Sequence, residues 1–524
     1  PQGQYTSTGR LDGTSFDTDD LYLHLGYKFG AAKNHYIAFK AEQHRLTTES
    51  WTDPTTLEYP VTDFRIELPQ RDRQKLGIYY DGRDLDPILR NVHVDAFYQT
   101  IDRQFLNEVV MVPTPVQTIT VTSTSDDQIV DFGGTAQADF QFHRDHYTIV
   151  GVHYLSDGLD AAKTSTTSRA IRNVPRPIVT YSEGIDQAVR RTLSGFVQNE
   201  WSFADDFKLT TGVRYYHTQI SHDRSLSGRA QPPGGVVPVN PVATSPDSSE
   251  GRLVTSAGLT YTGIENTTLR ALYSEGYITP TLLQLYTDTT AGSGTTTLGN
   301  PFLKSETSRN VEIGARYNAG DLVLDAAAFY TTAKNYITRT PCTAQLGCSA
   351  ADVRAGNHIN VNADAATTYG LELAAEYTVP GTAFTPYATG TWMRRKLELT
   401  ETFGRWATYD TNTPSLSGRF GVRWEGEVAN HDAWADLYVR AATGVDRTTW
   451  VARRAPLVSG FETESLPGWA TLNFAFGGSF GGEDDDRFRY AVSFNNILDK
   501  EYRSSFEEIP GVGRSVEVSL RMKF

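Results

Sequence analysis

The chain has 524 residues, a formal net charge of −14 and a mean hydropathy of −0.40. It contains no run approaching the ~20 consecutive apolar residues that a membrane helix requires, which excludes a helical membrane protein. Its acidic balance excludes a basic nucleic-acid-binding surface. Tyr (27), Phe (25) and Gly (44) are nevertheless abundant. That composition is typical of a barrel whose lipid-facing and lumen-facing residues alternate.

Alternation of apolar and polar residues predicts β-strands along the chain. Residues 311–317, for example, place Val311 and Ile313 on one strand face and Glu312 and Arg316 on the other. We count about nineteen such strands, each near the ~10 residues that a tilted membrane strand needs. Charged residues at alternate positions indicate a wet interior and not the dry core of a soluble sandwich.

The connections between these strands alternate strictly between short and long. The short polar turns lie at residues 143–146, 204–206, 263–266, 318–321, 380–382, 429–431 and 481–486. The long segments lie near residues 103–133, 158–189, 220–250, 279–304, 337–357, 399–411, 445–462 and 500–511. This parity predicts an all-β, antiparallel transmembrane β-barrel with short periplasmic turns and long extracellular loops. Segment 220–250 is rich in Pro and Gly, which predicts a mobile loop.

Two cysteines, Cys342 and Cys348, lie six positions apart in one of the long segments. We expect a small disulfide there, worth roughly 2 kcal/mol on the loop-closure model. Such a bond suits an oxidising, exported location. The alternative is a pair of unbonded loop cysteines.

The last strand has the clearest pattern of the chain. One face carries Val516, Val518, Leu520, Met522 and the terminal Phe524. The other face carries Glu517, Ser519, Arg521 and Lys523. We expect the first face to contact lipid and the second to face the lumen.

Five stretches in order resemble one family, the TonB-dependent receptors. They are residues 195–201 (Gly-Phe-Val-Gln-Asn-Glu-Trp) with 211–215, 274–280 (Ser-Glu-Gly-Tyr-Ile-Thr-Pro), 299–308 (Gly-Asn-Pro-Phe-Leu-Lys-Ser-Glu-Thr-Ser), 369–372 (Tyr-Gly-Leu-Glu) and 496–502 (Asn-Ile-Leu-Asp-Lys-Glu-Tyr). The second is similar to the family's aromatic–Arg–Ala–Pro box, although Ile278 and Thr279 replace its Arg and Ala. The third resembles its Asn-Pro-Asn-Leu-Lys-Pro-Glu box, with Phe302 and Ser305 as departures. The resemblance covers roughly residues 190–524.

This resemblance implies an outer-membrane barrel of a Gram-negative bacterium, surrounded by lipid and lipopolysaccharide. Such barrels close about 22 strands around an N-terminal plug, whose short box contacts the TonB–ExbB–ExbD energy-transducing complex. Neither plug nor box is visible in the sequence. We therefore interpret residues 1–524 as the barrel domain without its first strands and plug, which another chain could supply. Open sheet edges in lipid would be costly.

The resemblance further implies active import of a scarce ligand, expected to be an iron chelate. Haem-importing members carry a His between the two boxes, and the stretch Thr281–Leu298 contains none, which favours a siderophore while leaving haem possible. The candidate ligand-binding residues are Tyr277, Tyr286, His222 and His358. For Tyr286 the alternative is an aromatic-belt residue at the membrane interface. For His222 and His358 the alternative is a solvated polar residue.

No catalytic motif, metal-ligand spacing or cofactor-binding pattern stands out, so we expect no enzyme. Arg214, Arg270, Arg316 and Arg489 fall on presumed lumen faces. They either pair with an anionic chelate or form a charge lattice with neighbouring acids, and the lattice is favoured. Two other functions stay open at this point, a passive porin-like channel and a structural outer-membrane subunit.

Overall fold

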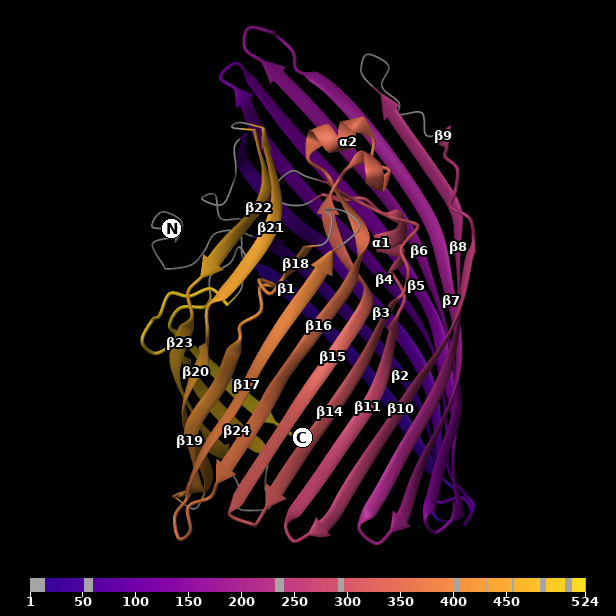
Figure 1. Ribbon diagram of the computed structural model, residues 1–524, viewed down its shortest axis with the longest axis vertical. Coiled ribbons are helices and arrows are strands. Elements are labelled where there is room, and N and C mark those ends of the chain that lie inside the picture. Colours follow the sequence, from indigo (N-terminus) through magenta and orange to yellow (C-terminus); the bar gives the residue numbers. More distant parts are fainter. Residues whose placement is uncertain are drawn as a thin grey trace.

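The computed structural model describes residues 15–50, 60–230, 240–290, 296–399, 406–429, 431–454, 457–480, 487–504 and 511–523. This part of the chain is built almost wholly from one antiparallel β-sheet, which curls into the wall of a barrel (Figure 1). Within it, no helix has both the length and the apolar character needed to cross a bilayer.

Nineteen strands follow one another as a meander, each hydrogen-bonded to the next. They are β1 (Phe16–Phe29), β2 (His35–Ser50), β3 (Val61–Arg83), β4 (Leu89–Thr114), β5 (Gln117–His143), β6 (His146–Ile171), β7 (Ile178–Ala204), β8 (Phe207–Ala230), β10 (Ser248–Ile264), β11 (Thr267–Ile278), β14 (Glu306–Asn318), β15 (Leu322–Pro341), β16 (His358–Tyr377), β17 (Phe384–Leu399), β19 (Leu416–Val428), β20 (His431–Ala442), β23 (Trp469–Ser479), β24 (Phe488–Asn495) and β25 (Ser515–Met522). The predicted fold class and strand number are confirmed.

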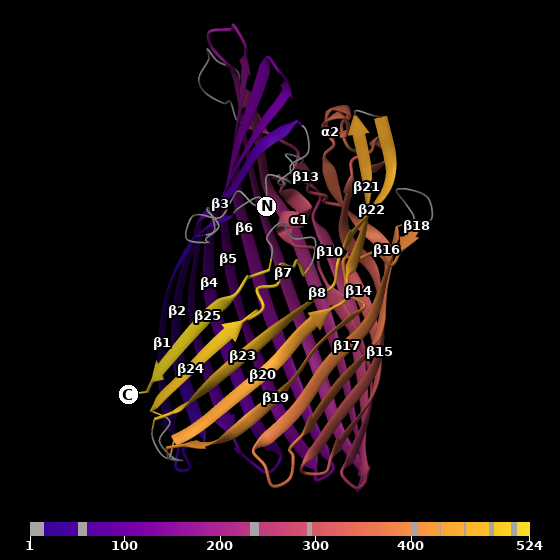
Figure 2. The same cartoon turned by 90° about the vertical axis from the view of Figure 1, so that its left-hand side faces the viewer.

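Shorter elements decorate one end of this wall. They are β9 (Asn240–Pro241), α1 (Leu282–Tyr286), β12 (Thr289–Thr290), β13 (Thr296–Leu298), the 3₁₀ helix η2 (Ala344–Leu346), α2 (Ala350–Ala355), β18 (Trp406–Thr408), β21 (Val445–Arg454) and β22 (Leu457–Leu466). Strands β9, β12, β13 and β18 join the main sheet, whereas β21 and β22 form a separate hairpin. Figure 2 shows this hairpin and α2 together at the end of the molecule opposite the tight turns.

The two outermost strands of the meander are β1 and β25. Each has one hydrogen-bonded neighbour, and the described residues contain no pairing between them. The described wall is therefore a curled sheet with two edges, and backbone groups at an edge within hydrocarbon need a further partner.

Outward and inward faces differ in the way the alternation predicts. On β16, Leu371 and Leu373 point outward and are 46% and 60% exposed. Val516, Val518 and Leu520 of β25 are likewise 60–68% exposed on the outer face, whereas Phe524 lies outside the described residues. Because the bilayer supplies the apolar contact, these large side chains lie on the outside of the protein instead of in a core.

Aromatic side chains mark the two bilayer interfaces on this outer face. One row lies near the tight turns and includes Trp201, Phe203, Tyr317, Tyr377 and Phe384. A second row lies further along the strands, where Tyr330, Tyr369 and Trp392 of adjacent strands are in ring contact. Tyr369 and Tyr377 are eight residues apart, ~26 Å along a strand that rises 3.3 Å per residue. With the ~35–45° tilt of such strands this is roughly 20 Å across the bilayer, of the same order as the ~25 Å apolar band of outer-membrane barrels.

The predicted tight turns are found in the described residues, but the opposite connections are not all long, since residues 115–116 alone join β4 to β5 and residues 172–177 join β6 to β7. The predicted turn at 481–486 lies outside the described residues. Three of the short turns, at 143–146, 204–207 and 264–267, join β5 to β6, β7 to β8 and β10 to β11, all at one end of the barrel (Figure 1). We call this the short-turn end and the opposite one the long-loop end. The assignment of the long-loop end to the cell exterior stays a prediction.

Two of the long segments are not loops, which corrects the sequence interpretation. Residues 103–133 and 158–189 belong mostly to β4, β5, β6 and β7, strands of 26 or 27 residues. These strands continue beyond the apolar band, where polar residues replace the outward apolar ones, mainly Thr and Ser on β5 and β6. Polar side chains are stable there because the strands are surrounded by water, and the hydrogen bonding between strands continues. In segment 220–250, residues 231–239, which carry much of its Pro and Gly, lie outside the described residues.

Neighbouring residues of β16 point to opposite faces of the wall, which gives a test of the membrane faces. Leu373→Arg should destabilise the folded barrel by about 2–4 kcal/mol, because it places a charge in the hydrocarbon. Ala374→Arg is the matched control, since Ala374 lies on the inner face and should tolerate the charge. The measurement is the fraction of heat-modifiable, folded protein in outer membranes. Equal folding of the two variants would contradict the assignment of faces.

Candidate ligand-binding site

The segment 279–304, which we call the inner segment, leaves the wall where β11 ends and returns to it at β14. Its helix α1 begins after Thr281, whose side chain accepts a hydrogen bond from the Gln284 amide while the Gln284 side chain accepts from the Thr281 amide. This capping box stabilises a helix of only five residues.

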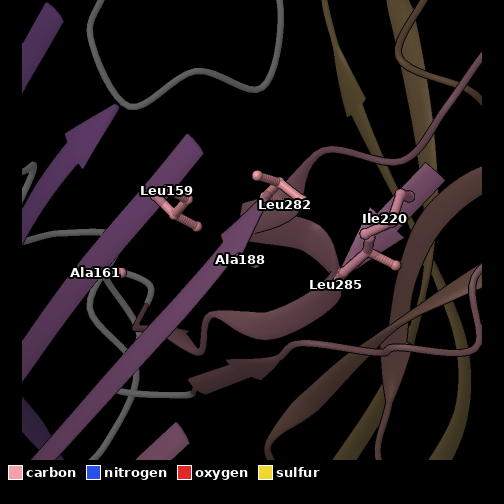
Figure 3. Packing of buried hydrophobic residues seen from close by; sticks show 6 residues of the cluster. All are labelled: Leu159, Ala161, Ala188, Ile220, Leu282 and Leu285. Atoms are coloured by element: carbon pink, nitrogen blue, oxygen red, sulfur yellow. The ribbon is translucent and has the colours of Figure 1, made fainter. Parts of the chain in front are cut away.

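Helix α1 packs on the inner face of the wall. Leu282 and Leu285 are 7% and 3% exposed and form one apolar cluster with four residues of the wall (Figure 3). Those residues come from β6, β7 and β8 and are Leu159, Ala161, Ala188 and Ile220. The cluster interrupts an otherwise polar inner face, so it fixes where α1 sits.

Polar contacts reinforce this attachment at both ends of α1. Arg190 of β7 donates to the Thr279 hydroxyl at 2.8 Å and to the Pro280 carbonyl at 3.1 Å. Lys163 of β6 donates to the Asp288 carbonyl at 2.7 Å. Neither Arg190 nor Lys163 was singled out from the sequence, because their role depends on a segment about a hundred residues further along the chain.

Strand β16 holds the other side of the inner segment. The Asn360 side chain donates to the Gln284 carbonyl at 3.2 Å, and Asn300 donates to the Asn360 carbonyl at 2.7 Å. The Lys304 amide donates to the Asn362 side chain at 2.8 Å. The two walls of the barrel mouth are thus bridged through the inner segment.

The predicted disulfide Cys342–Cys348 is confirmed. Both cysteines are buried in a cluster with Ile359 and Val361 of β16, against which Leu298 of β13 packs. The bonded loop also carries η2 and precedes α2, which Ser349 caps. The disulfide therefore supports β13, the returning strand of the inner segment.

His222 and Tyr286 come together although they are far apart in sequence. Their rings stack with centroids 4.2 Å apart. His222 is 8% exposed, its Nδ1 accepts from the Ser245 amide at 3.1 Å, and its Nε2 lies 3.2 Å from Asp186. The interpretations of His222 as a solvated residue and of Tyr286 as a membrane-belt residue are therefore wrong. Both residues are buried because α1 folds inward, which no local sequence pattern indicates.

This arrangement has consequences for metal chemistry at His222 and Tyr286. Both ring nitrogens of His222 already have partners, so neither is available to a ligand without rearrangement. Burial raises the pKa of Tyr286, and the nearby negative charge of Asp247 adds to this. A phenolate suited to ferric iron is therefore disfavoured.

The other two candidates lie elsewhere in the barrel mouth. Tyr277, near the end of β11, has its ring centroid 5.3 Å from that of Tyr216. His358 begins β16 beside Thr297 of β13 and is half-buried. No contact joins either residue to His222 or Tyr286 in the described ranges. Nor do these ranges contain a group of three or more His, Cys, Asp or Glu side chains suited to a metal ion.

A cavity of about 630 Å³ opens where β11 ends, between β10 and β14. Thr279, Pro280 and residues 303–305 of the inner segment and its return to the wall line one side. Four cations, Arg252, Lys304, Arg309 and Lys334, line it together with one carboxylate, Glu250. Sequence patterns did not single out this set, because its members come from separate elements.

Arginines deeper in the lumen form the charge lattice that the sequence favoured, with one departure. Arg270 pairs with Asp325 at 2.8 Å and with Glu312 at 3.3 Å. Arg214 instead donates to the Ser194 hydroxyl at 2.8 Å. It also lies over two aromatic rings of the inner face, those of Phe196 and Tyr216.

A family model described as TonB dependent receptor-like, β-barrel, matches residues 2–497. The chain belongs to the TonB-dependent receptor family. Members of this family are outer-membrane transporters and not enzymes, which agrees with the barrel described here.

A curated relative supports the outer-membrane location of this TonB-dependent receptor barrel. The iron-regulated outer membrane virulence protein of Vibrio cholerae serotype O1 is 28% identical over 228 residues, which are 43% of this chain and 29% of that protein. The match therefore spans less than a third of the relative's own length.

Solved structures share the fold of the receptor barrel. The copper transporter OprC superposes with a TM-score of 0.71 at 15% identity and covers 99% of this chain and 74% of its own. The FrpB iron transporter of Neisseria meningitidis (F3-3 variant) has a TM-score of 0.65 at 15% sequence identity, and the match covers 100% of this chain and 74% of the FrpB chain. The ferric-catecholate import receptor Fiu of E. coli K12 has a TM-score of 0.63 at 13% sequence identity, and the match covers 97% of this chain and 75% of the Fiu chain. At these identities the likeness shows the fold alone.

The apolar attachment of α1 can be tested by hydrogen exchange. Leu285→Ala should accelerate exchange of the α1 amides, since truncating a buried Leu costs about 2–5 kcal/mol of local stability. Phe302→Ala, in the same segment but 82% exposed, is the control and should leave α1 protected. Unchanged exchange in the Leu285 variant would show that polar contacts alone hold the helix.

The structural role of the disulfide gives a second test at this site. Cys342→Ser should lower the local stability of β13 by about 2 kcal/mol, seen as faster amide exchange at Thr296–Leu298. A reducing agent should reproduce this effect in the wild-type protein and add nothing in the variant. Equal protection of β13 with and without the bond would refute the proposed support.

Proposed function

We propose that this receptor actively imports an iron chelate across the outer membrane, with energy coupled through TonB, and that the chelate is a siderophore. The carrying observation is the inner segment, fixed in the barrel mouth by the α1 cluster and by Arg190, Lys163 and Asn360. It presents a built, polar surface to a ligand entering from the long-loop end.

The neighbourhood of the inner segment supports a siderophore over haem. The segment carries no His between Thr281 and Leu298. The nearest His in contact with it, His222, has both ring nitrogens occupied. A haem iron would therefore depend on His358, which makes no contact with α1 in the described residues, or on a group from a plug.

The iron-regulated relative in Vibrio cholerae and the iron transporters of the same fold agree with this assignment. The open edges at β1 and β25 fit a receptor whose wall and lumen are completed by further strands and a plug, from this chain's continuation or from another chain. Through that plug the receptor would contact the TonB–ExbB–ExbD complex.

Energy coupling separates this proposal from a passive channel. Cells expressing the full-length receptor should accumulate a labelled ferric siderophore, and an uncoupler of the inner membrane should stop accumulation while leaving surface binding intact. A deletion strain is the control. Accumulation that continues without the proton gradient would favour a porin-like channel.

The same strains test the ligand class. Growth under iron limitation should depend on the receptor when the iron source is a siderophore and be independent of it when the source is haem. Receptor-dependent growth on haem alone would overturn the siderophore assignment. Absence of any receptor-dependent iron uptake would overturn the proposed function itself.

A further inference from the structure

Basic residues gather on the outer face of β14, β15 and β17, strands that lie in one part of the wall (Figure 1). Strand parity places them outward, because Val311, Tyr330 and Trp392 of the same strands are exposed on that face. We call this set the basic patch, and its members are Arg309, Lys334, Arg394 and Lys396.

Strand register places the basic patch at the depth of the lipid headgroups. Arg394 pairs directly with Tyr369 and therefore lies level with the second aromatic row. Arg309 and Lys396 lie two residues further toward the long-loop end, and Lys334 lies four, which is ~7 and ~13 Å along the strands. Aromatic belts mark the boundary between hydrocarbon and headgroups. The patch therefore begins where the headgroups begin.

The basic patch carries more positive than negative charge. Arg309 lies 3.4 Å from Glu275, and Lys396 lies 2.5 Å from Glu398. The other two cations are exposed and make no ion pair in the part of the chain that the structure describes. Two positive charges of the patch thus face the outside without a counter-charge from the protein.

The outer face of β4, β5 and β6 is acidic at the corresponding level. Asp102, Asp126 and Asp160 lie there, and their carboxylates accept hydrogen bonds of 2.6–2.8 Å from glutamine side chains of neighbouring strands. Beyond the ring contact of Phe132 with Tyr154, the outward positions of these three described strands carry no Lys or Arg. Because the two signs of charge are separated around the wall, the basic patch is complementary to an anionic partner.

The basic patch extends into a recess of the wall. Arg309 and Lys334 also line the cavity of about 630 Å³ beside β10. Thr307, Thr332 and Asn335 line it with them and add hydroxyl and amide groups. Cations together with hydroxyl and amide groups suit a phosphorylated sugar.

We infer that the basic patch is a docking surface for lipopolysaccharide. Its cations bind the phosphate groups of the lipid's disaccharide headgroup, because Arg and Lys form strong, charge-assisted hydrogen bonds with phosphate oxygens. The acyl chains then lie along the apolar outer face below the aromatic row. The inference depends on the long-loop end facing the cell exterior, where lipopolysaccharide forms the outer leaflet, and it is independent of the imported ligand.

The width of the basic patch favours lipopolysaccharide over a phospholipid. It spans three strand spacings from β14 to β17, roughly 14 Å at ~4.8 Å per spacing. A phospholipid such as phosphatidylglycerol has one phosphate, whereas the lipopolysaccharide headgroup has phosphates at both ends of a disaccharide. Two separated phosphates can contact cations at both sides of the patch.

The test measures the lipopolysaccharide that the full-length receptor retains after purification from outer membranes in detergent. An EDTA wash first removes lipid that is held only through divalent cations. Lys334→Gln with Arg394→Gln should lower the amount retained per barrel about tenfold, because charged hydrogen bonds to phosphate are lost. Lys334→Arg with Arg394→Lys should retain it. The matched control is Lys208→Gln with Arg144→Gln, which removes the same charges at the short-turn end.

A second arm uses the wild-type receptor after its lipid has been stripped. It should rebind intact lipid A and bind lipid A without its phosphates about tenfold more weakly, and an excess of phosphatidylglycerol should not compete. Heat-modifiability verifies that each variant is folded. Equal retention by the patch and control variants, or equal binding of the two forms of lipid A, would overturn the docking surface. Competition by phosphatidylglycerol would overturn the assignment to lipopolysaccharide.

Discussion

Hydrogen bonding of the backbone in a medium without water is the constraint on which the rest of this protein depends. Every strand that crosses the hydrocarbon needs a neighbour on each side, and the nineteen-strand meander from β1 to β25 provides them for all but its two edges. Side chains are then free to alternate, so Leu373 faces lipid while Ala374 faces the lumen. The same ladder continues above the bilayer in β4 to β7, where it builds a tall wall in water.

The proposed ligand site lies where the ladder is interrupted. Strand β11 ends early, and the chain turns inward as the inner segment before β14 resumes the wall. A small apolar cluster around Leu282 and Leu285 fixes this detour, because apolar contact is otherwise scarce on a polar inner face. The detour leaves a cavity lined by four cations and one carboxylate.

The sequence predicted the wall well and the barrel mouth poorly. Period-two alternation and turn parity are local signals, and they placed the strands and tight turns of the described residues correctly. The strand extensions at 103–133 and 158–189 were taken for loops because apolar alternation stops at the membrane surface while hydrogen bonding does not. His222 and Tyr286 were misjudged because their burial depends on α1 packing against β6 to β8, a contact that no local pattern encodes.

The amino-acid sequence by itself determined the fold class, the family resemblance and the disulfide partners, since Cys342 and Cys348 are close in the chain and strand faces follow from residue parity. Only the tertiary structure decided which distant residues meet. It stacked Tyr286 on His222, tied Arg190 to Thr279, and gathered Arg252, Lys304 and Lys334 around one cavity. The physical reason is that the proposed ligand site depends on long-range contacts between elements, whereas the barrel wall depends on a repeat that each strand carries in its own residues.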